Sequence, residues 1–221
     1  MDSIRLKARA KINLGLDVLG KREDGYHEVR MVMQTIGIYD RLILTKIPEE
    51  EIRITSNLAF LPVNENNLIY KAIKLLKDEY HFPGGVSVDL NKFIPVAAGM
   101  AGGSTDAAAV LRALNGLFGY PLSRARLIEL AGTLGSDVPF CLRGGTAVCT
   151  GYGEIMTGVR SKTPLCLLIA TGGENVSTPW AFEMLDCRYQ NFDGRKTDPE
   201  RLLRLTAALE NGDAASAAQN M

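Results

Sequence analysis

The sequence contains few residues of the kinds that hold metals or cross-link small folds. It has two histidines and four cysteines among 221 residues. Cys141, Cys149, Cys166 and Cys187 lie 8, 17 and 21 residues apart, with no CxxC pair. This spacing excludes a structural zinc site and a small disulfide scaffold. We therefore expect reduced thiols and a cytoplasmic protein.

Net charge and long apolar runs are also missing. The 25 Lys and Arg residues balance 25 Asp and Glu residues, which argues against a partner held by bulk charge, such as nucleic acid or an anionic membrane. The longest strongly apolar run, residues 165–170, is far shorter than the roughly 20 residues of a spanning helix. The N-terminus alternates charged and apolar residues from Arg5 onward, which is unlike a signal peptide. With 46% hydrophobic and 23% charged residues, the composition is that of a soluble globular protein.

The first twenty residues carry the clearest strand pattern. Apolar residues occupy the even positions from Ile4 to Val18, and polar residues occupy most odd ones. This period of two predicts a long half-buried strand, with Lys11 and Asn13 together on the outward face, away from the core. The further predicted strands cover residues 29–36, 41–45, 51–55 and 86–90.

Four apolar stripes at helical spacing follow, each with its own start signal. Asn67 precedes a stripe from Leu68 to Tyr80, and Ser123 precedes a third one. The second stripe begins at Ala107, after Ser104-Thr105-Asp106, and the fourth opens at Asp198-Pro199. Because strands and helices do not alternate strictly, we expect an α+β fold.

A domain boundary is expected where Gly, Ser, Thr and Lys interrupt two apolar segments, at residues 151–163. We place one domain over residues 1–155 and a second over residues 156–221. A strand over residues 165–170 would begin the second domain. That domain reads as unfinished, because the sequence stops inside another helix that begins near Asp213.

The strongest local feature is a loop of small residues at 95–106, between a strand and a helix. Such a loop lets the backbone approach a ligand, and the helix after it offers free N–H groups and a positive dipole end. Together these features predict a phosphate cradle. Gly103 is followed by Ser104-Thr105, so the loop is not a Walker A motif, and GxGxxG is also absent. The alternative is a small-residue turn that serves only close helix packing.

Residues 95–106 resemble the second signature of the GHMP kinases, the superfamily of galactokinase, homoserine kinase and mevalonate kinase. Residues 8–16 with 22–27, and residues 135–147 with 151–154, are similar to signatures of the 4-diphosphocytidyl-2-C-methyl-D-erythritol kinases. The resemblance covers essentially the whole chain. It implies a GHMP-kinase two-domain fold, with a ribosomal-protein-like β/α domain followed by a ferredoxin-like α/β domain that is incomplete here. It also implies a transferase of the non-mevalonate isoprenoid route that moves the ATP γ-phosphate to the substrate's 2-hydroxyl, with ATP and Mg²⁺ as cofactors.

The resemblance assigns the catalytic step to two residues. Asp137 would accept the proton of the attacking hydroxyl, and Lys11 would keep that carboxylate ionised. Without the resemblance, Asp137 reads as a turn or cap residue and Lys11 as a solvated strand lysine.

The substrate and nucleotide contacts are implied in the same way. Asn13 would orient the substrate, Tyr26 would stack on the cytosine, His27 would contact it partly through its backbone, and Phe182 is the candidate for its other face. The ordinary alternatives are a surface amide, a strand-end aromatic, a turn histidine and a core phenylalanine. The expected ATP-binding residues are Asn67, Pro95, Val96, Ala97, Ala98, Gly99, Met100, Ala101, Gly102, Gly103, Ser104 and Thr105. Asn67 alone reads as a helix cap, and Ser104 is a candidate Mg²⁺ contact.

Family members continue through a third glycine-rich signature, and nothing after Gly172-Gly173 matches it. We therefore expect a fragment that is less stable and less active than a full-length relative. Two alternatives remain open, namely another GHMP small-molecule kinase and a non-catalytic nucleotide-binding module. Gly25-Tyr26-His27 separates the first of these, because a cytidine pocket would not serve mevalonate or homoserine. The expected partner is a small molecule, and the expected state is a monomer or weak homodimer.

Overall fold

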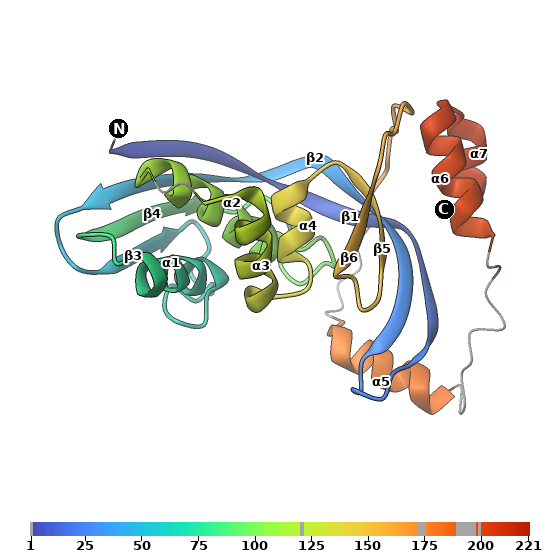
Figure 1. Ribbon diagram of the computed structural model, residues 1–221, viewed down its shortest axis with the longest axis horizontal. Helices are drawn as coiled ribbons and strands as arrows, with labels where there is room; N and C mark the ends of the chain where they lie inside the picture. Colours follow the sequence, from blue (N-terminus) through green and yellow to red (C-terminus); the bar gives the residue numbers. More distant parts are fainter. Residues whose placement is uncertain (1, 120–121, 172–175, 189–197, 199) are drawn as a thin grey trace. The chain divides into compact units, whose positions relative to one another are not determined.

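The computed structural model describes residues 2–119, 122–171, 176–188, 198 and 200–221. It divides into two compact units that share two long strands (Figure 1). Unit 1 comprises Met1–Lys11, Ile36–Val96 and Met100–Arg143, and unit 2 comprises Ile12–Thr35, Ala97–Gly99 and Gly144–Met221. In chain order the elements are β1 (Ser3–Lys21), β2 (His27–Ile47), β3 (Ile52–Ser56), α1 (Leu68–Tyr80), β4 (Gly85–Asn91), α2 (Gly102–Leu117), α3 (Arg124–Leu134), α4 (Val138–Arg143), β5 (Thr146–Thr150), β6 (Ile155–Val159), α5 (Thr178–Arg188), α6 (Arg201–Asn211) and α7 (Ala214–Gln219).

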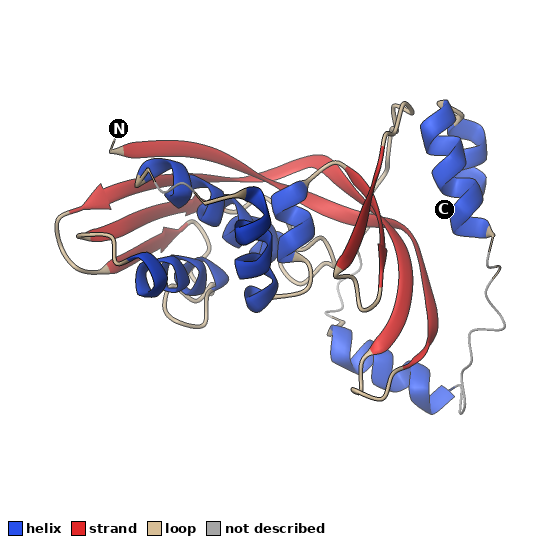
Figure 2. Ribbon diagram, viewed as in Figure 1, coloured by secondary structure: helices blue, strands red, loops and turns tan. Residues whose placement is uncertain are grey.

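Unit 1 is a strand layer with helices on one face (Figure 2). The end of β2 pairs antiparallel with β4, with Leu42 opposite Leu90, and β3 lies parallel to β4. Alternate residues of β4 point inward, as the pattern predicted, and Val86, Val88 and Leu90 are buried against α1 and α2. Burying such side chains contributes about 1.5–3 kcal/mol each. This core holds the loop of residues 95–101 and the helix that follows it.

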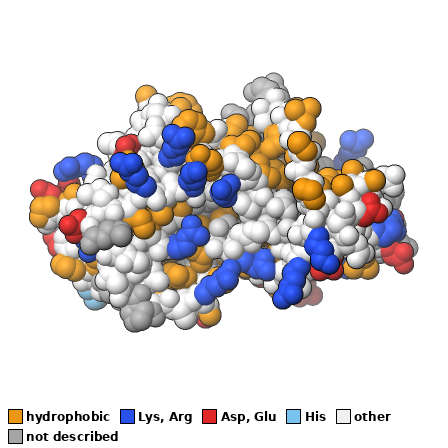
Figure 3. Space-filling view, turned by 90° about the horizontal axis from the view of Figure 1, so that it is seen from above, with side chains coloured by type: hydrophobic (Ala, Val, Ile, Leu, Met, Phe, Trp, Pro, Cys, Tyr) orange, Lys and Arg blue, Asp and Glu red, His pale blue; other side chains and the backbone are white. Residues whose placement is uncertain are grey.

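The outward row of β1 carries cations. Arg5, Lys7 and Arg9 are exposed, and Lys7 and Arg9 lie 4.6 and 5.8 Å from the centroid of the Tyr39 ring. Figure 3 shows Lys and Arg side chains gathered on the face of the molecule seen from above. The charged ends of Lys7 and Arg9 lie over the Tyr39 ring, as in cation–π contacts, and the row is otherwise an ordinary exposed strand face.

Unit 2 has a smaller core. The first part of β2 pairs with β5, with Val32 opposite Val148, and β5 pairs with β6. Leu202, Leu205 and Leu209 of α6 pack on Leu14 and Val32. The Asp17 carboxylate, inside β1, accepts a hydrogen bond of 2.7 Å from Arg201. The amphipathic face of α6, and not a further strand, therefore covers this part of β1.

The α+β fold is confirmed, and three local expectations need correction. Residues 29–36 and 41–45 lie in one strand, β2, which continues through Gly37 and Asp40. Residues 161–171 form a loop and not a strand, and Leu168 is 98% exposed. A strand needs a neighbour to bond, and none of the described strands pairs with this segment. The helix α2 begins at Gly102, so Ser104-Thr105-Asp106 lie inside its first turns.

The other predicted helix starts agree with the structure. The Ser123 side chain caps α3 by accepting a bond from the Arg126 N–H, and Asp213 caps α7 in the same way. The expected fourth helix starts at Arg201, just after Asp198, and Pro199 lies outside the described residues. Among the described helices, none combines the length and the apolar character needed to cross a membrane.

Candidate active site

Lys11 and Asp137 form an ion pair in unit 1. The Lys11 Nζ lies 3.3 Å from the Asp137 Oδ1, and their side chains are 6% and 33% exposed. The prediction that Lys11 points away from the core is wrong, because the residue is buried. The Lys11 backbone N–H donates to the Met100 carbonyl at 3.2 Å, so the end of the small-residue loop lies over this part of β1.

Asp137 owes its position to a tight connection between two helices. Gly135 ends α3, the Val138 N–H donates to its carbonyl, and α4 begins at Val138. The Asp137 carbonyl accepts from the Cys141 N–H at 3.0 Å, which leaves the carboxylate at the helix start. Burial, together with the charge of Asp137, raises the pKa of the Cys141 thiol to about 12. The neighbouring cysteine is therefore neutral.

The small-residue loop has an unusual backbone. Ala97, Gly99 and Ala101 all have positive φ, at 58°, 72° and 55°. Left-handed alanines cost roughly 1 kcal/mol or more each, so the surrounding structure must hold them. Ala101 is the N-cap of α2 and makes no side-chain cap bond there. The helix thus begins with N–H groups that no capping side chain occupies, which suits a bound anion.

The loop hydroxyls differ in their surroundings. The Thr105 hydroxyl is buried and donates to the Arg9 carbonyl at 2.6 Å, so it ties α2 to β1. Ser104 is partly exposed in the first turn. Of the two residues, Ser104 is the more accessible.

A buried charge cluster joins both ends of the loop, and sequence reasoning missed it. Lys92 binds the carboxylates of Asp40 and Asp106, the latter at 2.8 Å. Asp40 also accepts from the N–H groups of Phe93 and Ile94 at 2.6 and 2.9 Å. The Lys92 Nζ would lie 3.0 Å from a Cβ at Gly102. The cluster therefore fixes the chain before the loop, and the helix after it.

Burial and mutual attraction both shift the pKa values of this cluster. It raises the pKa of Asp106 to about 8, against the pull of Lys92. The pKa of Lys92 is also raised, since attraction to Asp106 and Asp40 outweighs the opposing effect of burial. The Asp106 Oδ1 has no hydrogen-bond partner among the described residues. The sequence feature that could have indicated this cluster is Asp106, a single carboxylate beside the alanines of α2.

The residues expected at the cytosine lie in unit 2. His27, the first residue of β2, is buried; its Nε2 lies 2.7 Å from Asp186 Oδ1, and its ring stacks on Phe182 at 4.5 Å. Hydrogen bonds from Lys21 and then from His27 lower the pKa of Asp186. Tyr26 packs against Tyr152. Neither Asp186 nor Tyr152 was assigned to the substrate from the sequence, although Tyr152 lies in the signature at residues 151–154 and Asp186 lies one helical turn after Phe182.

Two other candidates are polar surface residues in this structure. Asn13 is exposed. Asn67 is the N-cap of α1, as expected: its Oδ1 accepts from the Ile69 N–H at 2.9 Å and its Nδ2 donates to the Pro62 carbonyl at 2.6 Å. Both ends of the Asn67 amide thus have partners, and its contact with adenine stays a prediction.

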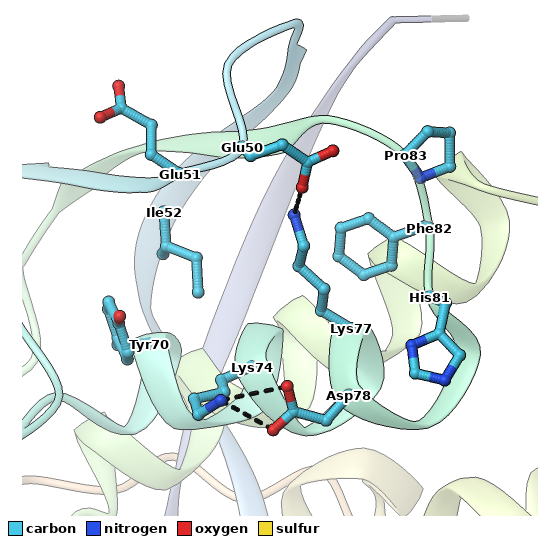
Figure 4. Close-up of a pocket in the computed structure, with 10 residues that line it drawn as sticks. All are labelled: Glu50, Glu51, Ile52, Tyr70, Lys74, Lys77, Asp78, His81, Phe82 and Pro83. Atoms are coloured by element: carbon cyan, nitrogen blue, oxygen red, sulfur yellow. Dashed lines mark hydrogen bonds and ion pairs between the residues drawn. The ribbon is translucent and has the colours of Figure 1, made fainter.

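A separate pocket lies beside the end of α1 (Figure 4). Lys74 pairs with Asp78, and Lys77 pairs with Glu50 from the far side of the pocket. None of the candidate site residues is among the ten described side chains that line it. Because its lysines already have carboxylate partners, the pocket suits solvent rather than an anionic ligand.

Known proteins similar to this chain identify its family. The family described as "GHMP kinases N terminal domain" matches residues 67–145. A 4-diphosphocytidyl-2-C-methyl-D-erythritol kinase of Caldicellulosiruptor bescii is 44% identical over 218 residues, which cover 99% of this chain and 74% of the relative. The chain belongs to the 4-diphosphocytidyl-2-C-methyl-D-erythritol kinase family.

Other relatives fit this assignment. The family member from Lachnospira eligens is 61% identical over 84% of this chain. A crystal structure of 4-(cytidine 5'-diphospho)-2C-methyl-D-erythritol kinase matches with a TM-score of 0.71 and 32% identity, covering 95% of this chain and 72% of that one. A homoserine kinase from Cytophaga hutchinsonii shares the fold, with a TM-score of 0.68 at 20% identity. The matched region spans 65% of the Lachnospira eligens kinase and 62% of a relative from Caldicellulosiruptor saccharolyticus, so this chain covers less than two thirds of those family members.

Proposed function

We propose that the protein phosphorylates the 2-hydroxyl of 4-diphosphocytidyl-2-C-methyl-D-erythritol with ATP, in the non-mevalonate route to isoprenoid precursors. The observation that carries this proposal is the pair of Lys11 and Asp137. A buried ammonium lies 3.3 Å from a carboxylate that remains one third exposed. Phosphoryl transfer needs positioning and charge stabilisation more than covalent chemistry.

Each group in the pair has one task. The Asp137 carboxylate accepts the proton of the attacking hydroxyl late in the reaction, when bond formation to phosphorus makes that hydroxyl acidic. Lys11 pairs with the carboxylate and stabilises the negative charge that develops on the attacking oxygen. The backbone N–H groups at the start of α2 hold the phosphates.

Mg²⁺ belongs to the proposal as the ion that accompanies ATP. No group of three or more His, Cys, Asp or Glu side chains suited to a metal occurs in the described ranges. Asp40 and Asp106 are occupied by Lys92, and the partly exposed Ser104 hydroxyl beside the loop is the candidate oxygen donor. This sparse set fits an ion that keeps several waters and is bound largely by substrate phosphates.

The cytidine end of the substrate is assigned to unit 2. Tyr26 is 60% exposed and offers its ring to the base, and base–aromatic stacking contributes roughly 1–3 kcal/mol. The His27 backbone and Asn13 complete the set, with Phe182 as the second aromatic. Residues 156–221 would belong to the C-terminal domain of the family fold.

A coupled ADP-release assay tests the proposal, with Mg-ATP and 4-diphosphocytidyl-2-C-methyl-D-erythritol. Mevalonate and homoserine serve as matched acceptors without a cytidine. We expect turnover with the cytidylyl substrate alone. Turnover with mevalonate or homoserine would point to another GHMP kinase. Nucleotide binding without turnover, in this chain and in a version extended to the length of its relatives, would favour the non-catalytic module.

A further inference from the structure

Two turns of unit 2 bring a pair of tyrosines together. Tyr26 ends the turn between β1 and β2, and Tyr152 lies in the turn between β5 and β6. Their ring centroids are 5.2 Å apart at an angle of 34°. They remain 60% and 40% exposed, so the pair presents aromatic surface to solvent. Tyr152 is not among the residues that the family resemblance assigned to the substrate.

The turn that carries Tyr152 is built around two glycines. Gly151 and Gly153 have φ of 73° and 117°, in the region that favours glycine. A Cβ at Gly151 would lie 2.3 Å from the Glu154 carboxylate, and one at Gly153 would lie 2.9 Å from the Met31 methyl group. The Tyr152 N–H donates to the same Glu154 side chain at 2.7 Å. The backbone of Tyr152 is therefore held in one conformation.

One carboxylate links the two turns. The Glu28 side chain accepts from the Gly151 N–H at 3.2 Å and from the Arg22 guanidinium at 3.2 Å. The Arg22 N–H in turn donates to the Tyr26 carbonyl at 2.8 Å, and its guanidinium lies 5.8 Å from the Tyr152 ring centroid. The backbones beneath both tyrosine rings are thus tied to each other through Glu28 and Arg22.

We propose that Tyr152 is a positioning residue that holds the Tyr26 ring in place to stack on the cytosine. This inference rests on the proposed function, since it assumes that Tyr26 receives the base. An exposed tyrosine at a turn would otherwise exchange between rotamers, and ordering it would reduce the affinity for the base. Contact with the Tyr152 ring restricts Tyr26 before substrate arrives, while most of the Tyr26 ring stays accessible.

Substitution of the Tyr152 ring tests this assignment. In Tyr152→Leu we expect the Kd for cytidine 5'-diphosphate, measured by titration calorimetry, and the KM for the cytidylyl substrate to rise about 3–10-fold, as for loss of an aromatic pair. The kcat and the KM for ATP should stay within about twofold. Tyr152→Phe keeps the ring and should restore both values. Phe60→Leu removes a ring that is 72% exposed in unit 1 and serves as the matched control.

Three results would overturn the inference. Unchanged Kd and KM in Tyr152→Leu would remove Tyr152 from base recognition, as would an equal loss in Tyr152→Phe. A fall in kcat together with a lower melting temperature would reduce Tyr152 to a structural residue. The proposed function fails separately, in the ADP-release assay of the unsubstituted chain. If the unsubstituted chain and Tyr26→Leu bind cytidine 5'-diphosphate equally well, Tyr26 is not the stacking residue, and the role of Tyr152 falls with it.

Discussion

The two units share β1 and β2 but stabilise them by different means. In unit 1, α1 to α4 cover the strands with a continuous core that includes Leu42, Val88 and Leu111. The core of unit 2 is smaller and depends on α6 and α7, while Ile155, Leu168 and Trp180 are 58%, 98% and 54% exposed. Since buried apolar area drives folding, unit 1 is expected to be the more stable of the two.

The two units also differ in how deeply their charged side chains are buried. In unit 1, Asp40, Lys92 and Asp106 form a connected buried cluster, and Lys11 is buried beside Asp137. In unit 2 the ion pair of Lys21 with Asp186 is partly exposed and contributes little to stability, although the Asp17 carboxylate beside Arg201 is buried. Deep packing thus fixes the groups proposed for catalysis, whereas the residues proposed for base recognition are held by turns and polar contacts.

The largest effect is expected at Asp137. Replacement by Asn removes the proton acceptor but keeps the shape of the side chain, so turnover should fall about 10²–10⁴-fold. The affinity for cytidine 5'-diphosphate, which we assign to unit 2, should not change. The coupled assay and titration calorimetry measure the two quantities. Turnover within a few-fold of the unsubstituted chain would contradict the role of Asp137.

Lys11→Ala provides the companion experiment, because β1 offers a matched control. Lys7 lies on the same strand but is exposed. We expect Lys11→Ala to abolish most turnover and Lys7→Ala to leave it unchanged. Equal activity in the two variants would show that the Lys11–Asp137 pair is structural.

Core truncations compare the two units directly. Leu111→Ala in α2 should lower the free energy of unfolding of unit 1 by about 2–5 kcal/mol, because Leu111 is fully buried. Leu205→Ala in α6 should loosen α6 and α7 and leave unit 1 intact. Amide hydrogen exchange, read separately over β4 and α6, measures both effects. If each variant accelerated exchange equally in both segments, the units would not be independent.

A smaller effect concerns pH. Burial raises the pKa of Asp106 to about 8 from its ordinary 3.8, so between these pH values the folded chain keeps a proton that the unfolded chain has lost. The contribution of Asp106 to the unfolding free energy therefore declines as the pH rises from about 4 to about 8. Asp106→Asn cannot titrate, so its melting temperature should fall less between pH 5 and pH 9. Asp89→Asn, an exposed control on β4, should keep the original slope.

Features that depend on local sequence could be predicted, whereas features that depend on distant parts of the chain could not. The alternation of Val86, Val88 and Leu90 and the caps at Asn67 and Ser123 depend on local geometry, and the structure confirms them. Alternation also put Lys11 on the outward row, but it could not tell that the backbone of Met100 would cover it. The apolar run at 165–170 predicted a strand, yet a strand depends on a partner that its own sequence does not contain.

The candidate site shows the same limit. The family motifs identified Lys11 and Asp137, which the structure brings to within 3.3 Å of each other. Asp40 and Lys92, and likewise His27 and Asp186, are far apart along the chain, and only the fold joins them. Contacts of this kind follow from topology and packing, which no periodicity reports.

The smallest expected effect separates a helix cap from a nucleotide contact in unit 1. Asn67 and Ser123 cap α1 and α3 through the same kind of side-chain bond, at 2.9 and 3.2 Å. Alanine at either position should cost about 1 kcal/mol of stability. If Asn67 also contacts adenine, as the family resemblance implies, Asn67→Ala alone should raise the KM for ATP. Equal KM values in Asn67→Ala and Ser123→Ala would leave Asn67 as a cap, because the matched loss of stability would then account for its whole effect.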